Sequence, residues 1–234
     1  MLTPIFYAIQ LDYITHTINL QPPKPYTMAK LPAGVLGPLI GQIGPIVGSS
    51  RNGVPYVKGE YKSRTKTISN RELANRKKFA VAQQFLKPLL HFVKTGWAGY
   101  SEKSYGFIAA KSHLLKNAME GEPDNPIVNP ALVKVSHGNL GLPQGIVASK
   151  IGDDTLEFSW DTSSYSGYMY DQAMLLAYDI EQRRSFAITT GDFRHTGKSR
   201  MRIGTGYNCH LYFAFVAHDR SSQSDIVYFG TMSF

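Results

Sequence analysis

Apolar and polar side chains alternate residue by residue in the C-terminal half of the chain, and this pattern limits the fold more than any other feature. Residues 155–160 (TLEFSW) and 209–215 (CHLYFAF) both show it. Successive side chains of a β-strand point to opposite faces of the sheet, so a period of two indicates strands with one buried face. Turn signals at 152–154 and 204–206 separate such runs. Roughly seven strands fit after residue 131, which is typical of a β-sandwich of immunoglobulin or fibronectin type.

A proline-rich stretch precedes this half. Residues 121–130 read GEPDNPIVNP, and three prolines with two Asn oppose both helix and interior strand. We therefore predict a domain boundary here, with a basic, glycine-rich and helical domain at 28–125 and the sandwich at 126–234. We interpret residues 1–27 as an extended arm that need not be native, because residues 28–30 (MAK) resemble a translation start. The arm has no signal-peptide pattern, so we expect a cytoplasmic or virion-associated protein.

The positive charge is concentrated before this boundary. Residues 28–120 hold fifteen Lys or Arg against four acids, whereas residues 121–234 hold nine against twelve. Such an asymmetry indicates either a solvated basic face or a surface for a polyanion such as nucleic acid. The cations that would form the polyanion site are Arg51, Lys58, Lys62, Arg64, Lys66, Arg71, Arg76, Lys77 and Lys78, with Tyr56 and Tyr61 available for stacking.

Residues 31–50 carry no charge, and their glycines recur at spacings of three and four. On a continuous helix these glycines would form a packing seam of the kind seen in membranes. Pro38 and Pro45 oppose such a helix, and too few residues are apolar for a span. We therefore predict short strands with Gly-Pro turns that let backbones pack closely, and no membrane insertion.

Two helices are expected between these strands and the boundary. Residues 69–72 (SNRE) form a capping-box pattern, which predicts a helix start at this point. Pro88 should interrupt that helix, and a second helix is predicted for residues 104–120. The apolar residues of the first helix that are expected to face the protein core are Leu73, Phe79, Ala82, Leu86, Leu89 and Val93.

Several segments resemble known proteins. Residues 156–161 (LEFSWD), 173–178 (AMLLAY) and 212–217 (YFAFVA) resemble the Trp-bearing and Tyr-bearing strands of fibronectin type III modules. With the glycine-rich start, Arg76 and Phe79, and the ending at 224–230 (SDIVYFG), nearly all of residues 28–234 resemble a family of Bacteroidota proteins known as a domain of unknown function. This resemblance implies no activity. The opening is also similar to phage proteins with the pattern NPxTxxQxxR, from which residues 66–76 (KTISNRELANR) depart.

No motif in the sequence predicts catalysis or a cofactor. Residues 191–199 (GDFRHTGKS) resemble a phosphate loop, but their glycine spacing is too long and a strand pattern follows. Residues 204–209 (GTGYNC) lack the third glycine of a dinucleotide site. Cys209 lies on an apolar face, and the seven His show no metal spacing. Neighbouring acids such as Asp154 and Asp161 are expected to cap turns.

Together these patterns predict an α+β, mainly β fold: glycine-rich strands and two helices, followed by a sandwich. The function that fits best is a non-enzymatic structural or adhesive module, within a phage-like or envelope assembly, that binds a protein partner or itself. The alternative is a nucleic-acid or polyanion binder that uses the basic half. A glycan hydrolase would require paired acids in a cleft, which the sequence does not indicate.

Overall fold

The computed structural model describes residues 29–35, 37–51, 53–63, 65–100, 105–163 and 168–234. The arm predicted at 1–27 lies outside these residues. The fold is α+β and mainly β, as predicted, with twelve strands in four antiparallel sheets among the described residues. The chain divides into two compact units, Met1–Arg64 and Thr65–Phe234. Each unit is described separately below.

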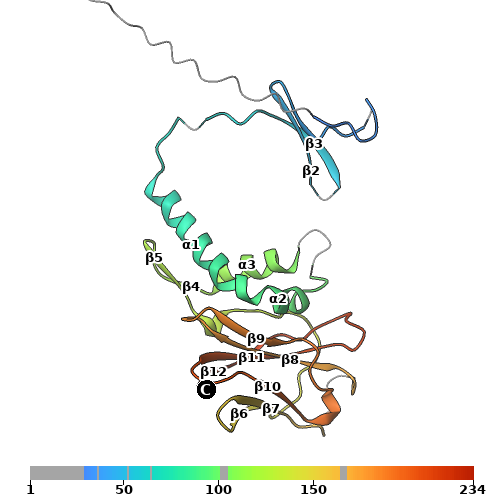
Figure 1. Ribbon diagram of the computed structural model, residues 1–234, viewed down its shortest axis with the longest axis vertical. Coiled ribbons are helices and arrows are strands. Elements are labelled where there is room, and N and C mark those ends of the chain that lie inside the picture. Colours follow the sequence, from blue (N-terminus) through green and yellow to red (C-terminus); the bar gives the residue numbers. More distant parts are fainter. Residues whose placement is uncertain (1–28, 36, 52, 64, 101–104, 164–167) are drawn as a thin grey trace, which may run out of the picture. The chain divides into compact units, whose positions relative to one another are not determined.

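The first unit contains a three-stranded antiparallel sheet of order β1-β2-β3 (Figure 1). Its strands are Gly41–Ile43, Ile46–Arg51 and Val54–Gly59. Gly44 and Pro45 make the first turn, and Gly44 adopts φ of 54°, a left-handed conformation that suits glycine. The prediction of short glycine-rich strands in this segment is confirmed. No helix among the described residues is long and apolar enough to cross a membrane.

The second unit begins with the predicted capped helix. Helix α1 (Asn70–Leu86) starts after Ser69, whose hydroxyl accepts a hydrogen bond from the Glu72 amide at 3.3 Å. Pro88 lies in a 3₁₀ turn, Lys87–Leu89, that separates α1 from α2 (Leu90–Gly96), so the predicted interruption is confirmed. Helix α3 (Gly106–Asn117) is shorter than the predicted 104–120, because the chain is already extended at Met119.

A hairpin follows α3 at the place where the sequence predicted a domain boundary. Strand β4 (Met119–Glu122) pairs antiparallel with β5 (Asn125–Val128), so residues 125 and 126 lie within the hairpin. Gly121 has φ of 83° and lies in β4, opposite Pro126. A 3₁₀ turn, Pro130–Leu132, leads on to the sandwich.

Two antiparallel sheets form the sandwich. One has the order β10-β7-β6 and the other β12-β11-β8-β9. The strands are β6 (Val147–Ile151), β7 (Thr155–Ser159), β8 (Gln172–Asp179), β9 (Arg184–Ile188), β10 (Lys198–Arg202), β11 (Asn208–Val216) and β12 (Val227–Ser233).

Helices cover the outer face of the four-stranded sheet, which gives the second unit three layers (Figure 1). Side chains of β8 alternate between two cores: Leu175 faces the other sheet, whereas Leu176 packs among the helices. Trp160, directly after β7, packs against Phe213 and Phe215 of β11 with ring centroids 5.4 and 5.3 Å apart. The four-stranded sheet is therefore buried on both faces.

The first turns of α1 lie outside the helical core. Ala82 and Leu86 are fully buried as predicted, but Leu73 and Phe79 are 42% and 55% exposed. The prediction was wrong for these two residues because the buried part of α1 is confined to its C-terminal end, which packs on the sheet layer. Helical spacing alone does not show how far along a helix its packing partner extends.

Candidate functional site

The β1–β3 sheet is exposed on both of its faces. Gly48 is the only buried residue in its three strands. Among the described residues, every buried hydrophobic side chain belongs to the second unit, starting at Ala82. The sheet therefore has no hydrophobic core of its own, although its strands carry several apolar side chains.

One face of this sheet is apolar and carries no charge. Residues paired directly across antiparallel strands share a face, and the register pairs Ile43 with Ile46 and Gly48 with Val57. Ile43, Ile46 and Val57 are 53%, 45% and 62% exposed. We call this surface the uncharged face; its members are Gly41, Ile43, Ile46, Gly48, Ser50, Pro55, Val57 and Gly59.

Glycine is required at position 48 because Leu39 lies over it. A Cβ atom there would collide with the backbone and the side chain of Leu39. At Gly59, by contrast, a Cβ atom would meet nothing within 4 Å. The close backbone contact that the sequence predicted for this segment is thus present at Gly48.

The opposite surface is the basic face, formed by Gln42, Val47, Ser49, Arg51, Val54, Tyr56 and Lys58. The Lys58 ammonium donates a hydrogen bond to the Tyr61 hydroxyl at 2.6 Å and lies 4.3 Å from the centroid of that ring. This hydrogen bond raises the pKa of Lys58 and lowers the pKa of Tyr61. Lys58 therefore remains a cation beside two aromatic rings, Tyr56 and Tyr61.

The predicted polyanion residues are divided between the two units. Arg51 and Lys58 share the basic face, and Lys62 follows β3. Arg64 lies outside the described residues. The remaining cations belong to the second unit, where they are Lys66, Arg71, Arg76, Lys77 and Lys78.

Two of the helix cations pair with acids. Arg76 contacts Glu72 at 2.8 Å, and Lys77 contacts Asp124 at 3.0 Å. Both are surface pairs, which contribute at most about 1 kcal/mol to stability. They nevertheless reduce the positive potential of α1, which also carries Arg71 and Lys78.

The loop that resembles a phosphate site is followed by strand β10, as the sequence predicted. Arg194 in this loop is buried and pairs with Asp171 at 3.4 Å. Its guanidinium also lies 4.1 Å from the centroid of the Phe215 ring. Burial lowers the pKa of Arg194, against the opposing effect of Asp171. The loop is thus fixed to the sandwich through a buried ion pair that spacing did not reveal.

The other candidate residues from the sequence are either buried in the core or hydrogen-bonded within turns and strands. Cys209 is fully buried, and burial raises the pKa of its thiol to about 12. Asp161 caps its turn through the Ser163 amide at 2.8 Å, and Asp154 pairs with Arg202 at 2.6 Å. Within the described ranges, no group of three or more His, Cys, Asp or Glu is placed to hold a metal ion.

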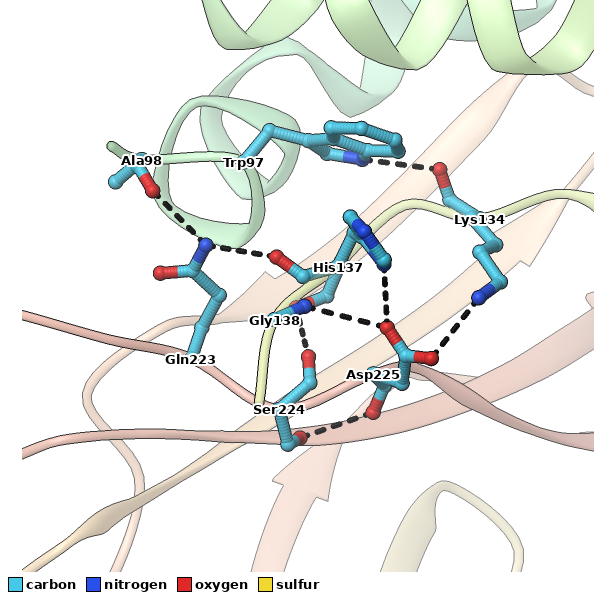
Figure 2. A network of polar contacts seen from close by, with 9 residues as sticks. Trp97, Ala98, Lys134, His137, Gly138, Gln223, Ser224 and Asp225 are labelled. Atoms are coloured by element: carbon cyan, nitrogen blue, oxygen red, sulfur yellow. Dashed lines mark hydrogen bonds and ion pairs between the residues drawn. The ribbon is translucent and has the colours of Figure 1, made fainter. Parts of the chain in front are cut away.

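Sequence reasoning missed a polar cluster where the helical layer meets the strands (Figure 2). His137 Nδ1 lies 2.6 Å from Asp225 Oδ1, and Lys134 Nζ lies 2.9 Å from Asp225 Oδ2. Burial alone would raise the pKa of Asp225, but hydrogen bonds from Lys134, His137 and the Gly138 amide outweigh it and lower the pKa. The residues that meet here lie 88 and 91 positions apart in the chain, so no local motif could have marked them.

Gln223 extends this cluster to the end of α2. Its Nε2 donates to the carbonyl oxygens of Ala98 at 2.9 Å and His137 at 2.8 Å. Trp97 Nε1 donates to the Lys134 carbonyl at 3.1 Å. The cluster therefore ties the helical layer to two segments of the sandwich (Figure 2).

A family model matches most of the chain. A family model described as a family of unknown function (DUF6266) matches residues 38–230, which include the β1–β3 sheet and nearly all of the second unit. No curated protein matches the chain. The match therefore groups these two units in one family and supplies no activity.

Proposed function

The chain belongs to this family of unknown function (DUF6266), and we propose that it is a non-enzymatic structural protein that associates with further copies of itself. The uncharged face of the β1–β3 sheet is the contact surface. A single observation carries the proposal: in the part of the first unit that the structure describes, this sheet exposes its apolar side chains and has no core.

A sheet of this kind needs a partner to be stable. Small sheets require a buried hydrophobic face or a packed helix for independent stability. Exposed apolar patches on soluble proteins mark interaction sites. Burial of Ile43, Ile46 and Val57 against another surface would supply the missing core. Assembly would then stabilise the sheet itself.

For a second copy of the chain as that partner, charge favours the uncharged face as the contact surface. A two-fold symmetric interface places the same patch against itself. On the basic face, such pairing would bring Arg51 and Lys58 close to the same two cations of the other copy. The uncharged face carries no charged side chain, so the same pairing on that face has no such repulsion.

The size of the face indicates weak pairwise association. Strands of at most six residues in a three-stranded sheet cover roughly 250 Å² at ordinary strand spacing. A stable interface buries about 800 Å² on each partner. The contact is therefore expected to be reversible between two copies and strong only where many copies assemble.

Sedimentation velocity over a wide range of protein concentration tests the proposal. We expect the apparent mass to rise with concentration, and association to persist at high salt because the contact is apolar. A protein that remains monomeric at the highest soluble concentration would exclude the proposed role.

We also infer that the sandwich is of the fibronectin type III or immunoglobulin kind and that the family is the Bacteroidota family it resembles. Strand order supports the first inference. When the strands are lettered in chain order, β6, β7 and β10 correspond to A, B and E, and β8, β9, β11 and β12 to C, C′, F and G. Trp160 then follows strand B, and Tyr212 lies on strand F.

Polyanion binding remains a second candidate function because of the basic face. Lys58, Tyr56 and Tyr61 combine a cation with rings on which bases can stack. A mobility shift of single-stranded DNA that weakens steeply with salt, and is lost in Lys58→Ala, would support it. No shift at low salt would remove this candidate without affecting self-association through the other face.

A further inference from the structure

Two hollows flank the aromatic pair Tyr100 and His137, which lines both of them. One hollow, of about 340 Å³, lies beside Gln223, and the other, of about 410 Å³, lies beside His113. The Tyr100 and His137 rings meet edge to face with centroids 5.7 Å apart. Each hollow is large enough for a small polar ligand, and the two share a wall.

Each hollow is lined by a residue with a buried polar atom that has no hydrogen-bond partner among the residues that the structure describes. These atoms are Gln223 Oε1 and His113 Nδ1. Gln223 is 5% exposed, and the orientation of its amide is fixed because Nε2 donates to two carbonyl oxygens. Oε1 is therefore the acceptor, and a buried acceptor without a donor costs about 1–3 kcal/mol.

Burial keeps the His113 ring uncharged. Burial, followed by the nearby Lys134 and His137, lowers the pKa of His113. The ring is therefore neutral at pH 7, with one nitrogen that donates and one that accepts. Such a ring pairs with a hydroxyl group, which can serve either role.

The remaining lining is rich in hydroxyl and amide groups and poor in charge. Asn139 and Ser222 line the first hollow, and Ser112 and Asn117 line the second. Lys116 is the only Lys, Arg, Asp or Glu among the lining residues. The half-exposed Tyr100 ring adds a flat apolar surface.

We propose that these hollows form a binding site for a neutral saccharide. Sugar hydroxyls donate to Gln223 Oε1 in one hollow and pair with His113 Nδ1 in the other, while a ring face of the sugar lies on Tyr100. A phosphorylated or sulfated ligand would need more cations than Lys116. A peptide would need apolar pockets for its side chains, and the lining offers few. This site is independent of the β1–β3 sheet and of self-association.

An array of neutral glycans, probed with the labelled chain of residues 1–234, tests the proposal. The strongest glycan is then titrated by NMR against the wild type and two variants. Tyr100→Ala removes the stacking ring, and Ser112→Tyr fills the second hollow from an exposed helix position. We expect a Kd in about the millimolar range or tighter and at least about tenfold weaker binding in both variants, a loss equal to about 1.4 kcal/mol.

Tyr105→Ala is the matched control, because Tyr105 is 79% exposed and lines neither hollow. It should bind as the wild type does. Circular dichroism of all variants separates lost binding from lost folding. The proposal is overturned if no neutral glycan binds, if folded Tyr100→Ala and Ser112→Tyr bind as well as the control, or if only charged glycans or peptides bind.

Discussion

Replacement of two isoleucines on the uncharged face should weaken self-association by a calculable amount. Ile43 and Ile46 are directly paired and are 53% and 45% exposed. Full burial of such a side chain contributes about 1.5–3 kcal/mol, so burial of the exposed half of each contributes about 2 kcal/mol for the pair. Two copies would lose this contribution on both sides of a symmetric interface. The total loss of about 4 kcal/mol means that Ile43→Ser with Ile46→Ser should raise the dimer Kd on the order of a thousandfold, whereas the loss of one side alone would raise it about thirtyfold.

The assay is sedimentation velocity of wild type and variants across the same concentrations. Val47→Ser with Val54→Ser is the matched control, because these residues belong to the basic face of the same sheet. Loss of strand propensity costs up to about 1 kcal/mol at such positions, and it affects both pairs alike. Equal weakening by the two pairs, or none by the isoleucine pair, would refute the assignment of the contact to the uncharged face.

Three further predictions concern the fold. Gly48→Val should disrupt the β1–β3 sheet and abolish self-association, because the new side chain collides with Leu39. Gly59→Ala should do neither, because a Cβ atom there meets open space. NMR amide shifts of β1–β3 show for each variant whether the sheet is intact. Cys209 should resist iodoacetamide at pH 8 in the folded protein and react in urea, because burial holds its thiol protonated up to a pKa of about 12; labelling of the folded form would contradict this. Asp171→Ala should destabilise the second unit by about 3–5 kcal/mol in urea unfolding, because it removes the carboxylate partner of the buried Arg194; a loss under about 1 kcal/mol would contradict it.

The parts of the fold that could be predicted from the sequence depend on interactions between residues that are near one another in the chain. The Ser69 cap and the Pro88 interruption each require only a few neighbouring residues, and both were found where expected. The alternation at 155–160 identified β7 because one face of that strand is buried and the other is not. In β8 the sequence AMLLAY hardly alternates, because both faces are buried.

The candidate sites were only partly predictable. The glycine spacing indicated close backbone contact, which the structure places at Gly48. The Asp225 contacts with Lys134 and His137 join segments that come together only in the fold. Likewise, no local pattern marks Gln223 as a buried acceptor. The fold brings these groups together from distant parts of the chain, so no short stretch of sequence contains the pattern that would identify them.

The four-stranded sheet is covered on one face by the helices and on the other by the second sheet, so its strands need the helices in the same polypeptide. A fragment that began at residue 126 would leave Met174, Leu176, Tyr178 and Tyr212 as bare surface, since their neighbours are the helices before it. Such a fragment should aggregate however intact its sandwich is. The helices therefore form one core with the strands that they cover. A truncated chain made to study the second unit alone should begin at residue 65.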